Sequence, residues 1–136
     1  MDGKSKFVKK IVVTTASPHD SKMFPDLMDE SDRGQVTFAD SAYVGQEETL
    51  KKYGLKDEIC EKGYRGKPLT DEQREENRKK SVIRSRVEHV FGFMEGAMHG
   101  LTVRTIGIAR ATAHIFLKCL TYNMFRYEQF VRNGIR

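Results

Sequence analysis

The stretch that decides the fold is Thr70–Gly100, TDEQREENRKKSVIRSRVEHVFGFMEGAMHG. Its apolar residues recur at three- and four-residue spacings, which predicts one long amphipathic helix over the whole stretch. Thr70 is a natural N-cap, and Gln73 three residues later completes a capping box. At about 100° per residue, a polar row lies within about 40° of one line, and an apolar row is centred about 120° away. The polar row comprises Asn77, Ser81, Arg84, Glu88 and Glu95, and the apolar row Ile83, Val87, Val90 and Met94.

Glu88 is the acid in the middle of the polar row. A helix with this pattern packs one side into a core, so Glu88 is expected at the edge of that core. Such a position is typical of a catalytic or metal-binding acid. Gly92 and Gly96 weaken the last turns, and we expect the helix to bend or end between Gly92 and Gly100.

Length and composition predict one domain, or part of one, because the chain has 136 residues and 38% apolar residues. No run approaches the roughly 18 apolar residues of a membrane span, and the start MDGKSK does not have the pattern of a signal peptide. Cys60 and Cys119 have no neighbouring metal-ligand pattern. They predict buried thiols of a reduced, cytoplasmic protein.

The net charge is +5, from 24 basic and 19 acidic residues. The excess of positive charge is concentrated in residues 101–136, which contain five arginines and Lys118 but only one acid, Glu128. This bias indicates a polyanionic partner, although a soluble basic surface explains the same balance.

The rest of the chain alternates predicted strands and helices, which is typical of an α/β fold. Expected strands cover residues 6–15, 35–39 and 55–60, with a break after the first at Ala16–Pro18. Expected helices, besides the long one, cover residues 20–28, 46–53 and 107–131. The apolar face of the last helix is marked by Ala109, Ala113, Phe116, Leu117, Leu120, Met124 and Tyr127.

Three further features have both a functional and a structural interpretation. The pair His19-Asp20 resembles a metal-binding dipeptide, but capping of the following helix, by Asp20 or Ser21, is the better explanation. Asp40 directly follows a predicted strand, at the sheet edge where ligands bind in open α/β sheets, but capping of a turn is the better explanation of this residue taken alone. Lys62, Arg65 and Lys67 lie in a glycine-containing loop that either contacts phosphates or is simply solvated.

Asp40 and Glu88, if they meet at the sheet edge, would hold a hard divalent cation such as Mg²⁺. Two such metals activate a nucleophile and stabilise the leaving oxygen in phosphodiester cleavage. Basic residues around them would attract the phosphates. From the pattern alone this is one hypothesis among several.

Several ordered motifs resemble DDE transposases of bacterial insertion sequences, and the resemblance extends from near residue 2 to about residue 127. The motifs are Thr14–Ser21 (TTASPHDS), Ala39–Tyr43 (ADSAY), Asn77-Arg78, Arg84–Gly92 (RSRVEHVFG) and Leu120–Arg126 (LTYNMFR). The resemblance implies an incomplete ribonuclease H-like fold, with a mixed sheet flanked by helices. It also implies catalysis by three metal-binding acids with Mg²⁺ or Mn²⁺.

By position, Asp40 matches the second Asp of that triad and Glu88 the closing Glu. Arg84 matches the arginine of the signature Tyr, two residues, Arg, three residues, Glu, six residues, Lys, and is implied to contact DNA phosphate or the acids. If the helix is continuous, Arg84 lies one turn before Glu88. The chain departs from the signature at Ser81, in place of Tyr, and at Glu95, in place of Lys. An acid at position 95 would oppose a phosphate there.

The family's first Asp lies upstream on a central strand, and this chain begins after it. Residues 1–136 are therefore expected to be a single domain, the carboxyl-terminal part of a transposase catalytic domain. The first Asp and the amino-terminal DNA-binding region would be missing. Open strand edges would then pair with a second copy or with an amino-terminal transposase fragment.

The first hypothesis for function is a transposase fragment related to DNA cleavage and strand transfer, inactive or nearly so by itself. The second is a non-catalytic remnant that binds DNA or transposase and inhibits it. The third is a plain nuclease that recruits its missing acid from a partner.

Overall fold

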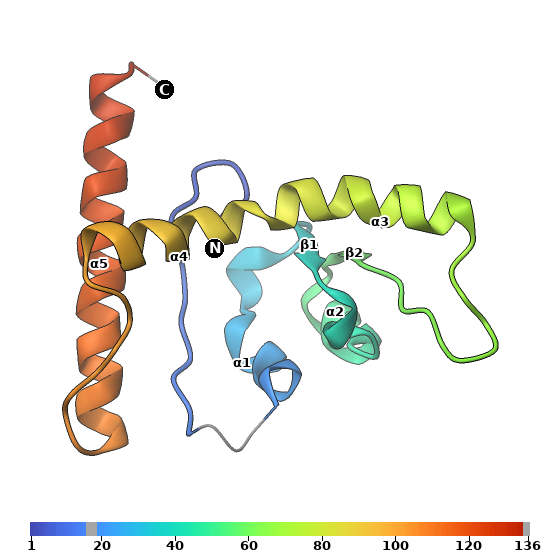
Figure 1. The fold of residues 1–136 in the computed structure, drawn as a ribbon, viewed down its shortest axis with the longest axis horizontal. Helices are drawn as coiled ribbons and strands as arrows, with labels where there is room; N and C mark the ends of the chain where they lie inside the picture. Colours follow the sequence, from blue (N-terminus) through green and yellow to red (C-terminus); the bar gives the residue numbers. More distant parts are fainter. Residues whose placement is uncertain (16–18, 135–136) are drawn as a thin grey trace. The chain divides into compact units, whose positions relative to one another are not determined.

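The computed structural model describes residues 1–15 and 19–134, so the predicted strand break at Ala16–Pro18 lies outside the described residues. The ribbon of the chain is drawn in Figure 1, and its contacts divide it into two compact units. Each unit has its own cluster of buried side chains. The sheet unit ends at Ser85. The helical unit combines the amino-terminal segment with the chain from Arg86 onward. The assignment of all 136 residues to one domain stays a prediction.

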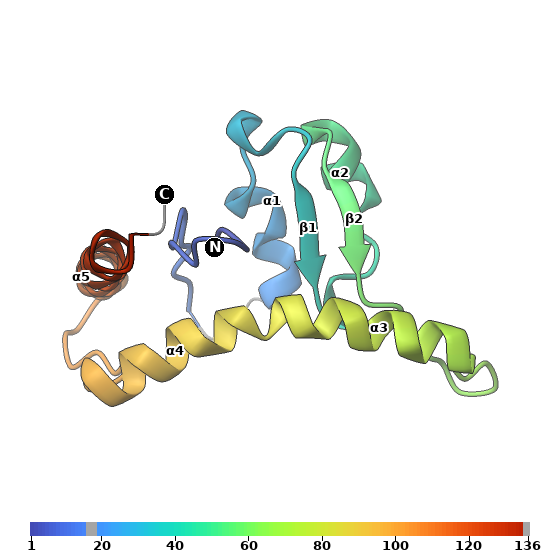
Figure 2. The same cartoon turned by 90° about the horizontal axis from the view of Figure 1, so that it is seen from above.

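The sheet unit contains two parallel strands, β1 (Val36–Ala39) and β2 (Lys56–Ile59), paired in register from Val36 opposite Lys56 to Ala39 opposite Ile59. The α-helix α2 (Glu47–Tyr53) connects them. Gly54 ends α2 in the left-handed conformation at φ 61°, which a glycine adopts without steric cost. Figure 2 shows both strands running toward α3 (Asp71–Arg84). The predicted second and third strands are thus confirmed, but among the described residues the sheet is parallel rather than mixed.

Short helical segments complete the sheet unit and supply part of its core. Phe24 and Leu50 pack with Ile59 of β2 in one buried cluster. His19, not Asp20 or Ser21, is the N-cap of the first segment, because its ring nitrogen Nδ1 accepts from the Ser21 N–H. The capping interpretation of His19-Asp20 is therefore confirmed with a different capping residue. These segments are η1 (Asp20–Met23), α1 (Phe24–Leu27), η2 (Glu30–Asp32) and η3 (Ser41–Tyr43).

Helix α3 begins as predicted. The Thr70 hydroxyl accepts from the Gln73 N–H at 3.2 Å, and the Gln73 side chain accepts from the Thr70 N–H at 2.9 Å. Its polar row does not simply face solvent. The Asn77 side chain pairs with both backbone groups of Glu61, at 2.8 and 2.9 Å, and Lys80 donates to the Ile59 carbonyl at 3.2 Å. These bonds fix α3 at the carboxyl end of β2.

The prediction of one uninterrupted helix from Thr70 to Gly100 is wrong. A break at Ser85 separates α3 from α4 (Arg86–Ala97). The Ser85 hydroxyl donates to the Val82 carbonyl at 3.0 Å, and its N–H bonds to the Ser81 carbonyl at 2.8 Å. A serine hydroxyl that bonds back to the preceding turn competes with the backbone ladder and bends or breaks a helix, which explains the interruption. Gly92 and Gly96, where a bend was expected, both lie inside α4.

The helical unit consists of α4, α5 (Ile108–Arg132) and the amino-terminal segment. Val90 and Met94 of α4, exposed by only 2% and 1%, pack against Cys119 and Tyr122 of α5. The apolar row predicted for this part of the chain and the burial of both cysteines are thus confirmed. Lys118 donates to the Met98 and Gly100 carbonyls just beyond α4, where a cation complements the helix dipole.

Residues 6–15 do not form the predicted strand. The physical reason lies at Val8, whose N–H donates to the Asn123 side-chain oxygen and whose carbonyl accepts from the Asn123 amide, both at 2.9 Å. A side chain of α5 thereby takes the two hydrogen bonds that a neighbouring strand would otherwise make. This partner lies 115 positions away and was not predictable.

The apolar face predicted for α5 is exposed in this chain, because α5 buries the opposite face. Met124 and Tyr127 are each 65% exposed, and Leu117 is 60% exposed. From Ala113 onward the apolar residues follow alternating spacings of four and three, a pattern that packs against another element. The exposed residues that were predicted are Ala109, Ala113, Phe116, Leu117, Leu120, Met124 and Tyr127, followed by Val131. No helix among the described residues is long and apolar enough to cross a membrane.

Candidate active site

Asp40 is the first residue after β1 and the N-cap of η3. Its Oδ1 accepts from the Ala42 N–H at 2.8 Å, so the turn-capping role is confirmed. Capping uses only part of a carboxylate, which has about four lone-pair positions on two oxygens. The exposed Asp40 side chain therefore caps the turn and keeps acceptor capacity for a ligand.

Asp20 is a second carboxylate near this turn, which sequence reasoning weighed as part of a metal-binding dipeptide and preferred as a possible cap. Burial raises the pKa of the Tyr43 hydroxyl, and the negative charges of Asp20 and Asp40 raise it further. A phenol held in its protonated form beside two acids is a hydrogen-bond donor at neutral pH. The sequence signal was the small, polar ADSAY turn directly after a strand, but nothing in the spacing linked it to Asp20.

Glu88 lies in the first turn of α4, where the helix dipole favours a negative charge. The break at Ser85 creates this position, because a continuous helix would have placed Glu88 in its interior. The Glu88 side chain is exposed, as expected for an acid at the edge of the Val90–Met94 core.

Arg84 lies in the last turn of α3, where the helix dipole favours a cation. The one-turn spacing predicted between Arg84 and Glu88 assumed a single helix, and Ser85 instead places them on two. Asp40 and Arg84 belong to the sheet unit and Glu88 to the helical unit. Within the described parts of the chain, no group of three or more His, Cys, Asp or Glu side chains gathers as a metal site.

The basic loop between β2 and α3 presents its cations on a tight turn. Tyr64 and Lys67 exchange two backbone hydrogen bonds of 3.1 and 3.0 Å, which places Arg65 and Gly66 at the tip. Gly66 has φ 86°, a conformation that favours glycine. Lys62, Arg65 and Lys67 are all exposed, so the structure leaves them accessible.

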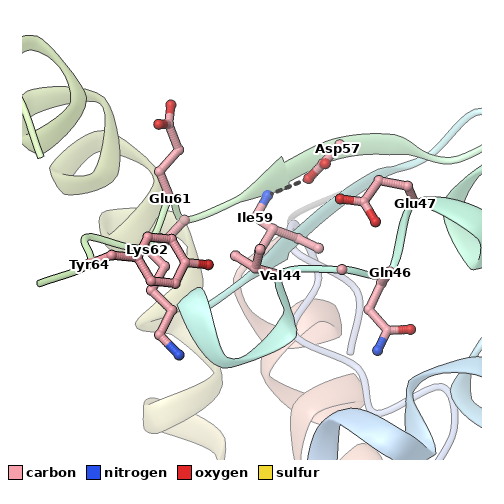
Figure 3. Close-up of a pocket in the computed structure, with 10 residues that line it drawn as sticks. Val44, Gln46, Glu47, Asp57, Ile59, Glu61, Lys62 and Tyr64 are labelled. Atoms are coloured by element: carbon pink, nitrogen blue, oxygen red, sulfur yellow. Dashed lines mark hydrogen bonds between the residues drawn. The ribbon is translucent and has the colours of Figure 1, made fainter. Parts of the chain in front are cut away.

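A pocket of about 270 Å³ lies beside this loop in the sheet unit (Figure 3). Lys62 and Tyr64 line it, whereas Arg65 and Lys67 do not. The acids Glu47, Asp57 and Glu61 also line it, and Asp57 accepts from the Ile59 N–H at 2.8 Å. Three carboxylates against one lysine repel a phosphate, so this pocket is poorly suited to DNA.

The family model described as "Transposase DDE domain" matches residues 1–124, and the chain belongs to this family of DDE transposase domains. Among curated proteins, it is similar to the transposase for insertion sequence element IS1106 of Neisseria meningitidis serogroup B. The two are 30% identical over 122 residues, which cover 88% of this chain and 42% of that relative. The chain thus spans less than half the length of the relative. No solved structure matches it.

The family match confirms the resemblance to transposases of insertion sequences. It does not favour the alternative of a non-catalytic inhibitor. Domains of this family generally use divalent metals.

Proposed function

We propose that this chain is the carboxyl-terminal part of a DDE transposase catalytic domain with a ribonuclease H-like fold. The complete protein would cut and join DNA ends in the bacterial cytoplasm. The observation that carries the proposal is Asp40, which directly follows β1 at the edge toward which both parallel strands run. Glu88, in the first turn of α4, supplies the second acid. Both positions lie within residues 1–124, which the family model matches.

Asp40 and Glu88 fit a hard divalent cation by their donor chemistry, because Mg²⁺ and Mn²⁺ both bind carboxylate oxygens. Both side chains are exposed, and Asp40 keeps acceptor capacity beyond its bond to Ala42. When bound, the metal would activate the attacking oxygen and stabilise the leaving oxygen. The two acids would hold it, and Arg84 would neutralise phosphate or acid charge nearby.

The isolated chain is inactive or nearly so in this proposal, because two acids rarely hold two metals in catalytic geometry. A third acid would come from residues outside this chain. The 42% coverage of the IS1106 transposase supports this part of the proposal, since most of that relative has no counterpart here.

The exposed apolar face of α5 would be covered by the rest of the transposase, either in the same polypeptide or in an amino-terminal fragment. An exposed face of this size and composition is typical of an interface. Among the described residues the sheet has two strands, so further strands from the rest of the transposase could pair at its outer edges. A second copy of the chain is the competing occupant. Sedimentation of the chain at several concentrations separates the two, because a stable dimer would favour the second copy.

A titration with Mg²⁺ and Mn²⁺, followed by NMR, tests the acids. Asp40→Asn and Glu88→Gln should each weaken metal binding and leave the fold intact, since Asn caps a turn as well as Asp does. Glu95→Gln is the matched control, because it removes an exposed carboxylate from the same helix as Glu88. Equal metal affinity in all four proteins would refute the assignment. Unfolding caused by Glu88→Gln would make Glu88 structural.

DNA binding tests the basic loop. We expect affinity for duplex DNA to fall steeply with salt, with a logarithmic slope of about −0.9 for each phosphate neutralised. A variant with Lys62, Arg65 and Lys67 all changed to Gln should bind more weakly and show a shallower slope. A matched control changes three other exposed lysines of the same unit to Gln, namely Lys22, Lys51 and Lys56. If both triple variants weakened DNA binding equally, the effect would come from the loss of overall charge, and the loop would not be a specific DNA contact.

A further inference from the structure

The helical unit contains a small basic recess, which we define by Lys6, His89, Phe93, Phe125 and Arg126. Tyr122 and Gln129 complete its lining, and its volume is about 130 Å³. None of these seven residues carries a carboxylate, in contrast to the pocket beside the basic loop. The volume is well below the roughly 300 Å³ at which small-molecule pockets begin, so it suits a single anionic group.

The amino-terminal loop places Lys6 at the recess. The Asp2 carboxylate accepts from the N–H groups of Lys4 and Ser5 and from the Ser5 hydroxyl. The Asp2 N–H bonds to the Phe7 carbonyl at 2.9 Å, and the Lys6 N–H to the Asp2 carbonyl at 3.0 Å. These bonds close the loop on itself.

Two arginines tie the closed loop to the helices of the unit. Arg86 of α4 donates to the Gly3 carbonyl at 2.6 Å, and Arg126 of α5 donates to the Ser5 carbonyl at 2.8 Å. Lys6 adopts φ 63°, a left-handed conformation that lysine rarely takes. Strain of this kind persists only where the surroundings enforce it, and it concentrates at functional positions.

The contact between Lys6 and His89 determines which of their nitrogen atoms can donate hydrogen bonds in the recess. The Lys6 ammonium lies 3.0 Å from Nδ1 of His89. An ammonium only donates, so Nδ1 accepts and the ring proton resides on Nε2. The recess therefore combines the remaining N–H groups of Lys6, the Nε2–H of His89 and the guanidinium of Arg126. All three are donors, and two are cationic.

We infer that this recess binds a DNA backbone phosphate, held by Lys6, His89 and Arg126. The inference rests on the proposed function, because it takes its phosphate from DNA. His89 directly follows Glu88 in α4, but neighbouring side chains of a helix point about 100° apart, and Glu88 does not line the recess. Half-exposed Phe125, at 46%, offers an apolar wall to the adjoining sugar or base.

The test compares Lys6→Gln with Lys4→Gln in the full chain, by fluorescence anisotropy with a labelled duplex over a range of salt concentrations. Lys4 is the matched control, because it is exposed, lies in the same loop and does not line the recess. Lys6→Gln should reduce the logarithmic salt slope by about 0.9, and Lys4→Gln should leave it unchanged. Lys6→Arg should restore the slope, since it restores the charge.

The NMR signals of the His89 ring provide a second readout that does not depend on the loop substitutions. They should shift when the duplex is added to the wild-type chain. If the wild type binds DNA but Lys6→Gln and Lys4→Gln have equal slopes, or if His89 does not shift, the recess is not a phosphate site and the proposed function survives. If the wild type does not bind DNA at all, both the recess and the DNA-binding part of the proposed function are overturned.

Discussion

Replacement of Asn123 by Ala should destabilise the helical unit by about 2 kcal/mol. Asn123 makes two hydrogen bonds of 2.9 Å to the backbone of Val8, one as acceptor and one as donor. A hydrogen bond contributes about 0.5 to 1.5 kcal/mol net, and two of them give about 1 to 3 kcal/mol. Val8 is only partly buried, so water replaces some of the lost interaction and the middle of that range applies.

Urea unfolding followed by circular dichroism measures this change, and hydrogen exchange locates it. The midpoint should fall while the dependence on urea stays constant, because the surface exposed on unfolding does not change. The Val8 N–H should exchange faster in the variant, since its acceptor is gone.

Thr121→Ala is the matched control for Asn123→Ala. Thr121 is exposed on the same helix, and its hydroxyl donates only to the Leu117 carbonyl of the preceding turn. Its loss should cost no more than about 0.5 kcal/mol. If Asn123→Ala and Thr121→Ala had equal stability, or if Val8 exchange were unchanged, the pairing of Asn123 with Val8 would not hold the amino-terminal segment.

Three further predictions concern stability. Met94→Ala should cost about 2 to 5 kcal/mol in urea unfolding, because Met94 is 1% exposed, whereas Met124→Ala, at 65% exposure, should cost under about 0.5 kcal/mol in the isolated chain. Thr70→Ala should destabilise α3 by about 1 kcal/mol through loss of the capping box, and equal stability to the wild type would contradict that role. Hydrogen bonds from Ser5 lower the pKa of Asp2 below its ordinary 3.8, so their contribution is complete above that pH and is lost as the pH falls through the folded-state pKa. Ser5→Ala should raise the Asp2 pKa in an NMR titration, and an unchanged pKa would contradict this assignment.

Local sequence signals predicted the elements whose ends are fixed by nearby residues. The Thr70–Gln73 capping box gave the start of α3, and Gly54 gave the end of α2. β1 and β2 were predictable because each is a short run bounded by turn residues. At these helix ends, the deciding interactions join residues only a few positions apart.

The failures involve choices that local patterns leave open. A serine at position 85 is compatible with a helix interior, and its bond to the Val82 carbonyl, which competes with the backbone ladder, is not evident from the sequence. Residues 6–15 have strand-forming side chains, but a strand also needs a partner, and Asn123 lies 115 positions from Val8. α5 has apolar residues on both faces, so periodicity identified a stripe without determining which face is buried here.

The candidate site followed the same division. Asp40 and Glu88 were singled out by pattern, and the resemblance supplied their places in the triad and the role of Arg84. The structure places each of the three at the end of a strand or helix. The recess around Lys6 and His89 was not predictable, because it joins residues 83 positions apart. A lysine with positive φ has no sequence signature.

In each unit, the side chain of one asparagine forms hydrogen bonds with both the N–H and the C=O of a distant residue. Asn77 pairs with the backbone of Glu61, and Asn123 pairs with the backbone of Val8, each through one donor and one acceptor. A carboxamide has the same donor and acceptor groups as a peptide unit, so each asparagine acts as a one-residue substitute for a neighbouring strand. At Val8 a side chain of α5 therefore satisfies a peptide unit of the amino-terminal segment, and at Glu61 a side chain of α3 does the same for the residue that follows Cys60 after β2.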